Sequence, residues 1–219
     1  MKKIISIVFI LLIFIVSSGF KYSQLEEKHF NIEDLYDYQK KFKSEEIDTC
    51  ALGETKSYMD YRATTDPSSK QFWFIRNNME VDSKTGFLID SDGFIGVALG
   101  SFYGTIGDRY YFTLESGVVL PVVKVEEKAD KDTDSNGCYH LSDGSVMEFV
   151  IDSDVANNYF GRYGNGLVLQ GNYANHKLFS GGFIKVEKVL DELRDDYVSY
   201  EDDKEIEHNH SLFNYASGY

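Results

Sequence analysis

Oxygen-bearing side chains recur at alternate positions in the second half of the chain, in a pattern suited to a hard cation. Asp132, Asp134, Asn136, Gly137 and Asp143 follow the spacing Asp-x-Asp-x-Asn-Gly-x5-Asp. Calcium takes several oxygen ligands from such positions, and the glycine permits the sharp turn that the loop requires. The flanks resemble strands rather than helices, and the same residue types also form ordinary turns. The segment is therefore either a calcium loop with its four oxygen-bearing side chains as ligands, or a polar turn.

The sequence lacks the residue patterns of zinc sites, catalytic nucleophiles, nucleotide-binding loops and nucleic-acid-binding surfaces. The five histidines have no paired spacing of the zinc-binding kind, and no serine, histidine or cysteine lies in a nucleophile motif. No glycine-rich loop opens a helix after a strand, so nucleotide binding is not indicated. The formal net charge of −14 opposes contact with phosphate backbones, and we expect no nucleic-acid partner.

The N-terminus has the layout of an export segment. Met1-Lys2-Lys3 supplies positive charge, and residues 4–20 follow without any charged side chain. This arrangement predicts a signal peptide or an uncleaved signal anchor over residues 1–20. Because the lysines precede the apolar run, the remainder of the chain is expected on the extracellular side of the membrane, anchored or secreted.

The two cysteines, Cys50 and Cys138, lie in the part of the chain expected outside the cell. An oxidising compartment permits a disulfide between them. Many bacterial surface proteins form no disulfide, so the sequence leaves both states open.

Composition changes along the chain predict three further regions. Residues 21–53 are highly charged, with apolar side chains at helical spacings, and we expect a helical stalk there. Residues 54–190 contain short apolar and aromatic runs separated by turn residues, which predicts a mainly β domain, a small barrel or a sandwich. The expected strands are 56–65, 71–76, 94–99, 109–114, 118–126, 145–151 and 182–189. Residues 191–219 are expected to form a short helix and then an acidic flexible tail.

A stretch rich in glycine, asparagine and tyrosine begins at residue 157 and includes Asn157-Asn158-Tyr159-Phe160-Gly161-Arg162-Tyr163-Gly164. It predicts an extended loop up to about residue 182. Its aromatic rings either stack on a sugar ring or pack down on the domain.

Four segments together resemble a known group of proteins. They are MDYRATT at 59–65, VALGSFYGT at 97–105, ADKDTD at 129–134 and VMEFVID at 146–152. This set is similar to uncharacterised proteins of phages and mobile elements of Gram-positive bacteria. The order of the segments more distantly resembles the three-aspartate (3D) domain, a double-psi β-barrel related to the barrel of lytic transglycosylases. The resemblance implies a small double-psi-like β-barrel with an N-terminal hydrophobic or helical tether, and peptidoglycan or another cell-wall glycan as partner.

The resemblance also implies a reaction, the cleavage of peptidoglycan glycan strands by a lytic-transglycosylase-like enzyme. One carboxylic acid with a raised pKa would protonate the glycosidic oxygen and then deprotonate the sugar hydroxyl. Glu148 matches the last acid of the family pattern, and Asp132 would support it. Tyr61 and Asp130 would contact substrate. Alternatively, Glu148 points outward from its strand and Asp132 is a solvated loop residue or a calcium ligand.

Two departures from the family pattern favour a different role. Leu99-Gly100 stands where the family has its first aspartate, and Asp134 with a longer polar loop replaces the glycines after the Asp-Thr pair. A barrel that keeps its fold without the full set of acids would be a non-catalytic surface or binding module, with or without calcium. A third alternative is an assembly component of a phage or conjugative apparatus.

Overall fold

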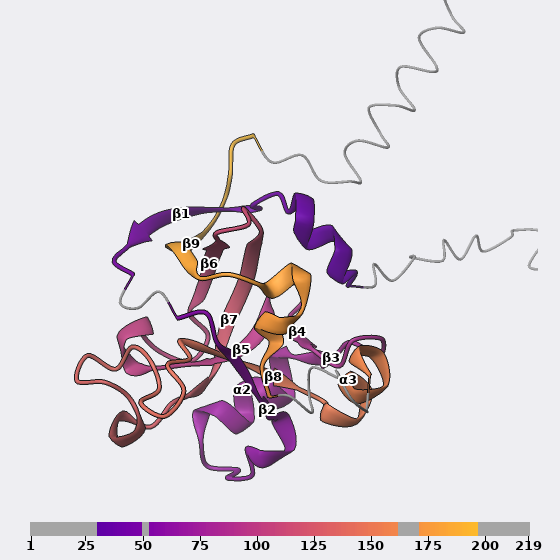
Figure 1. The fold of residues 1–219 in the computed structure, drawn as a ribbon, viewed down its shortest axis with the longest axis vertical. Helices are drawn as coiled ribbons and strands as arrows, with labels where there is room; N and C mark the ends of the chain where they lie inside the picture. The colour runs from indigo at the N-terminus through magenta and orange to yellow at the C-terminus, as the bar shows by residue number, and fades with distance from the viewer. Residues whose placement is uncertain (1–29, 50–52, 162–170, 197–219) are drawn as a thin grey trace, which may run out of the picture.

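The computed structural model of the chain describes residues 30–49, 53–161 and 171–196 (Figure 1). This part of the chain contains nine strands in one mixed sheet. The strands are β1 (Phe42–Ile47), β2 (Lys56–Asp60), β3 (Glu80–Val81), β4 (Leu88–Ile89), β5 (Ile95–Leu99), β6 (Arg109–Leu114), β7 (Val119–Glu127), β8 (Met147–Ile151) and β9 (Phe183–Leu193). The described helices are α2 (Lys70–Asn78), α3 (Ser153–Phe160) and six short 3-10 helices: η1 (Ile32–Asp37), η2 (Tyr61–Ala63), η3 (Ser101–Tyr103), η4 (Asp130–Asp132), η5 (Tyr173–Asn175) and η6 (Lys177–Phe179).

The strands follow the order β1-β9-β6-β7-β5-β4-β3, with β8 also pairing with β5, and β2 pairing with β8. β5 lies parallel to β7, and β2 lies parallel to β8, whereas the remaining pairs are antiparallel. Within the described residues β1 pairs only with β9, and β2 only with β8, so the sheet is not closed. The prediction of a mainly β fold is confirmed, but hydrogen bonds do not close the expected barrel.

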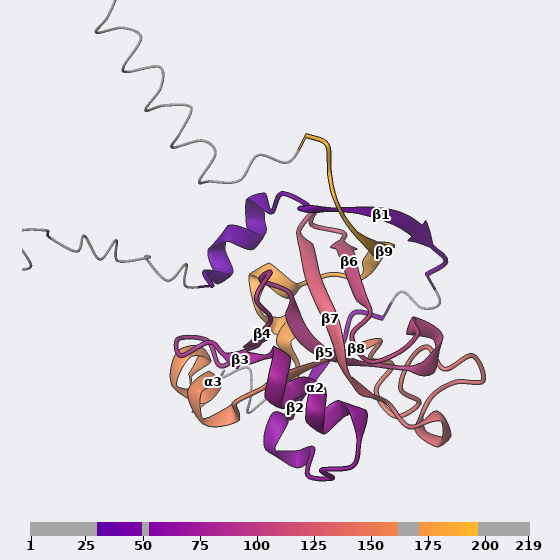
Figure 2. The ribbon, with the colours of Figure 1, turned by 180° about the vertical axis from the view of Figure 1, so that it is seen from behind.

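The central strands are buried on both faces, which explains their continuous apolar runs. In β6, Tyr110 and Phe112 point into one core cluster, whereas Tyr111 points into the other. η1, α3, η5 and η6 cover the first cluster, and Phe87 lies at its centre against the rings of Phe149, Tyr173 and Phe179. α2 and β1 contribute to the second cluster. Figure 2 shows this arrangement from behind, with α2 at the opposite end of the molecule from β1.

The prediction of a helical stalk over residues 21–53 is wrong for residues 30–49, which the structure describes. Residues 32–37 form the short helix η1, whose Ile32 and Leu35 are buried in the core, and residues 42–47 form β1 at the edge of the sheet beside β9. The folded domain therefore includes residues 30–49. Three of the apolar positions that suggested an amphipathic helix, Ile32, Leu35 and Phe42, are instead buried in the domain.

Two expected strands also differ from the structure. The segment 71–76 is part of α2, because Ser69 caps the helix by accepting a hydrogen bond from the Phe72 amide. The strand expected over 56–65 ends at Asp60, whose carboxylate accepts the Arg62 amide and starts η2. The remaining expected strands are present with small shifts at their ends.

The ends of the chain and part of the aromatic loop lie outside the described residues. This applies to the predicted export segment 1–20, to residues 162–170 and to the tail from residue 197. Residues 153–160 form α3 rather than the start of an extended loop. The helices within the described ranges are all too short or too polar to cross a membrane.

Candidate functional site

Glu148 lies on β8 and has a lysine as its charged neighbour. Its side chain is partly exposed, and its Oε1 is 3.3 Å from Nζ of Lys128. The ammonium group of Lys128 is buried and also donates to the Ser145 carbonyl at 2.8 Å and to Ser145 Oγ at 2.9 Å. Burial lowers the pKa of Lys128. The predicted catalytic role required burial or a second carboxylate beside Glu148, whereas the structure places a cation there.

The supporting acids expected beside Glu148 are directed elsewhere. Asp132 is exposed at the end of η4, and no described side chain forms a hydrogen bond or ion pair with its carboxylate. Asp130 accepts a hydrogen bond from Ser101 Oγ at 2.7 Å, which ties η4 to the turn after β5. The structure thus brings neither acid into contact with Glu148.

The backbone of another segment lies directly against Gly100. A Cβ atom at Gly100 would lie 1.9 Å from the carbonyl oxygen of Gly137. That oxygen accepts a hydrogen bond from the Phe102 amide at 3.1 Å, so it is held in place. No side chain fits at residue 100 without movement of this turn.

The residues with calcium-loop spacing do not converge on a common point. Asp134 uses its carboxylate to accept the amides of Asn136, Cys138 and Tyr139, which closes the turn. Asp143 accepts the Ser145 amide at 2.9 Å. No group of three or more acidic, histidine or cysteine side chains in the described ranges could hold a metal ion. Asp134 and Asp143 thus use their carboxylates in hydrogen bonds of the turns that contain them, whereas Asp132 lies at the end of η4.

Cys138 is fully buried and disulfide-bonded. Cys50 is the other cysteine of the sequence, and it lies outside the described residues. The disulfide that the sequence left open is therefore formed, and it fixes the turn whose Gly137 carbonyl blocks residue 100.

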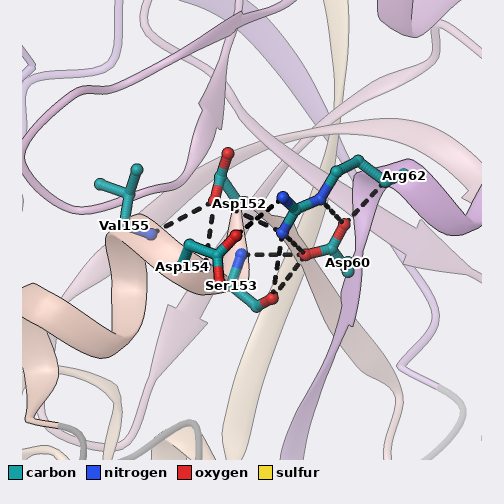
Figure 3. Close-up of polar contacts among 6 residues, drawn as sticks. All are labelled: Asp60, Arg62, Asp152, Ser153, Asp154 and Val155. Carbon is teal, nitrogen blue, oxygen red and sulfur yellow. Dashed lines mark hydrogen bonds and ion pairs between the residues drawn. The ribbon is translucent and has the colours of Figure 1, made fainter.

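A second charged cluster lies where the parallel strands β2 and β8 end (Figure 3). The guanidinium of Arg62 contacts three carboxylates: Asp60 at 2.6 Å, Asp154 at 2.8 Å and Asp152 at 3.6 Å. Ser153 adds a hydroxyl that donates to Asp60 at 2.5 Å. The hydrogen bonds from Arg62 hold the pKa of the Asp60 carboxyl well below its usual range, and the same bonds raise the pKa of Arg62.

The ion pairs of Arg62 are internal to the domain. They connect η2 to the first turn of α3, where Asp152 caps the helix by accepting the amides of Asp154 and Val155. Because three carboxylates already occupy the guanidinium, Arg62 has little capacity for a ligand. This cluster stabilises the end of the sheet.

Tyr61 connects that cluster to the surface of α2. Its half-buried ring lies beneath two guanidinium groups, with Arg76 at 5.2 Å and Arg62 at 5.8 Å from the ring centroid. Arg76 is also 5.4 Å from the ring of Phe72. Tyr61, the predicted substrate contact, therefore lies beside Arg76 of α2. Glu148 instead contacts Lys128.

The exposed side of α2 presents the most exposed large aromatic side chain among the described residues. Trp73, the one tryptophan of the sequence, is 57 % exposed. It lines an open groove of about 430 Å³, together with Lys70, Asn77 and Ile106. We call this hollow the α2 groove.

The α2 groove is held by local contacts. Gly107 adopts a φ of +98°, and a Cβ there would lie 3.1 Å from the ring of Phe74, so the turn containing Ile106 approaches α2 closely. The side-chain Nδ2 of Asn77 donates to the Trp73 carbonyl at 2.7 Å. The side-chain oxygen of Asn77 can still accept a hydrogen bond. A flat ring beside polar groups in an open hollow suits a sugar ring, which has both apolar and hydroxyl-bearing faces.

Trp73 and the α2 groove were missed because residues 71–76 were expected to form a strand. Ser69 as an N-cap, with Ile75 and Met79 four residues apart as buried positions, would have indicated a helix. The absence of acidic residues from 67 to 79, in a chain of net charge −14, also distinguishes this segment.

Comparison with models of protein families and with curated protein sequences gives no match.

Proposed function

We propose that this protein is a non-catalytic module of the cell envelope that binds peptidoglycan glycan in the α2 groove. The observation that supports this proposal is the exposed Trp73 ring in a groove with polar side chains. Sites for small ligands are commonly lined by aromatic side chains together with a few polar groups that orient the ligand.

The arrangement of the acids supports binding rather than cleavage. Glu148 is paired with Lys128, and a side chain at residue 100 would overlap the Gly137 carbonyl oxygen. A glycan cleaver of the expected kind needs an acid that can hold a proton at the scissile bond. A module with an exposed aromatic platform needs no such group.

Export of the chain is the second element of the proposal. The charge pattern of residues 1–20 supports a signal peptide or anchor, and the disulfide at Cys138 is typical of a protein outside the cytoplasm. In Figure 1 the described chain begins in the upper half of the molecule, whereas α2 lies at its lower end. The resemblance to proteins of phages and mobile elements suggests such an element as the source of the module.

Binding is tested by sedimentation with purified peptidoglycan sacculi. The full chain, in mild detergent, is mixed with sacculi of a Gram-positive species, and the bound fraction is measured for wild type, Trp73→Ala and Tyr36→Ala. Tyr36 is a matched control, because it is also an exposed aromatic residue, at 42 %, but lies on η1. We expect wild type and Tyr36→Ala to sediment with the sacculi and Trp73→Ala to remain in solution.

Two results would contradict the proposal. Failure of the folded wild-type chain to sediment with sacculi would remove the wall as partner. Release of anhydro-sugar products during the incubation, lost in Glu148→Gln, would instead establish the glycan-cleaving enzyme.

A further inference from the structure

The arginines of the described residues differ in one respect. Arg62, Arg109 and Arg194 each form at least one ion pair with a carboxylate. Arg76 is exposed, and no described carboxylate lies within ion-pair distance of it. In a chain with 36 acidic and 22 basic residues, an arginine without an acidic partner is unexpected.

The guanidinium of Arg76 is nevertheless held in position. It lies 5.2 Å from the ring centroid of Tyr61 and 5.4 Å from that of Phe72. Stacking of this kind restricts a long side chain without using its N–H donors. Arg76 therefore presents a group that is already oriented and whose hydrogen-bond donors are available.

Arg76 precedes Asn77 on α2, and Asn77 lines the α2 groove. Phe72, one of the rings beneath it, is in edge contact with Trp73, with 6.3 Å between the ring centroids. Lys70 lines the groove itself and likewise has no acidic partner among the described residues. A ligand that places a sugar ring on Trp73 and a negative charge about one helical turn further along α2 would match this surface.

We propose that Arg76 binds a carboxylate of the peptide stem while the sugar that bears the stem lies on Trp73. This inference rests on the proposed function and specifies its ligand as stem-bearing glycan rather than bare glycan. The planar guanidinium forms two parallel hydrogen bonds with a carboxylate, a geometry that an ammonium group cannot reproduce. Charge complementarity supports the assignment, because residues 67–79 carry the positive charges of Lys70 and Arg76 and no acidic side chain.

The test compares two soluble probes by calorimetric titration of the full chain. One probe is a neutral oligomer of N-acetylglucosamine, and the other is a disaccharide carrying a tetrapeptide stem with free carboxylates. We expect wild type to bind the stem-bearing probe about three- to tenfold more tightly, a factor typical of a partly exposed charge-assisted contact. Arg76→Gln should lose this preference, and Arg76→Lys should regain only part of it.

A third probe removes the negative charge from the ligand instead of the positive charge from the protein. Amidation of the stem carboxylates should weaken binding to wild type by the same factor and leave Arg76→Gln unaffected. Arg194→Gln is the matched control, since this exposed arginine already pairs with Asp196, and it should behave as wild type. The preference should also decrease as salt is raised.

The outcomes separate this inference from the proposed function. If Arg76→Gln retains the full preference for the stem-bearing probe while Trp73→Ala abolishes binding, the role of Arg76 is overturned and glycan binding stands. If wild type binds neither probe, the proposed function fails as well.

Discussion

Substitution of Gly100 by alanine should destabilise the domain strongly, although it adds only one methyl group. The backbone of Gly100 has a φ of −69°, which alanine adopts freely, so the cost is steric alone. The new Cβ would lie 1.9 Å from the Gly137 carbonyl oxygen and 2.7 Å from its carbon, and both are backbone atoms. Relief would require the turn to recede by more than an ångström, against its hydrogen bond to Phe102 and the disulfide at Cys138.

The expected loss is about 3 kcal/mol or more of the free energy of unfolding, at the upper end for overpacked interiors. Gly96→Ala, four residues earlier on β5, is the matched control. Its Cβ would meet only side-chain atoms, at 3.1 Å for Leu88, 3.2 Å for Met79 and 3.3 Å for Val125. Because these side chains can adjust, we expect a cost of about 1 kcal/mol. The loss of glycine freedom in the unfolded chain affects both variants equally and cancels in the comparison.

Urea denaturation followed by far-ultraviolet circular dichroism measures both values. If Gly100→Ala unfolds within about 0.5 kcal/mol of wild type, a change too small for a steric overlap of this size, the close approach of residues 100 and 137 is refuted.

Three further predictions concern stability. Burial lowers the pKa of Lys56 to about 8, so the unfolded chain binds more protons than the folded chain between pH 8 and 10.5. The free energy of unfolding of wild type relative to Lys56→Met should therefore rise by about 1.4 kcal/mol per pH unit in that window. Denaturation curves at several pH values measure this difference, and a constant difference would refute the prediction. Asp152→Ala should cost about 1 kcal/mol in chemical denaturation through loss of the α3 cap, and Asp152→Asn clearly less; equal losses would show that the cap is not the cause. Cys138→Ser should lower the free energy of unfolding by about 2–4 kcal/mol, and a reducing agent should lower wild type by a similar amount but leave the variant unchanged.

Local sequence patterns predicted those strands and turns whose conformation depends mainly on neighbouring residues. The hairpin of β6 and β7 follows from the Glu115-Ser116-Gly117 turn, where Gly117 has a φ of +87° and the Leu114 amide donates to the Val118 carbonyl. β5 was recognisable because a short run of buried apolar residues follows a turn.

The features that were missed depend on contacts between distant segments. β1 forms by pairing with β9, near the other end of the domain, and nothing in its charged sequence indicates that partner. Residues 71–76 contain aromatic side chains that favour strands, but burial of Ile75 and Met79 against the sheet makes the segment helical. The close contact between Gly100 and Gly137, and the exposure of Trp73, likewise exist only in the folded chain.

Fluorescence of Trp73 tests the central claim most directly, because this residue is the one tryptophan of the sequence and lines the α2 groove. The full chain is titrated with a soluble disaccharide fragment of peptidoglycan, and the emission of tryptophan is followed. We predict a saturable change in emission, caused by a sugar ring replacing water on the indole, with no change for an oligomer of glucose at the same concentration. Unchanged emission up to about millimolar fragment, a concentration at which even weak binding is visible, would contradict binding in the α2 groove.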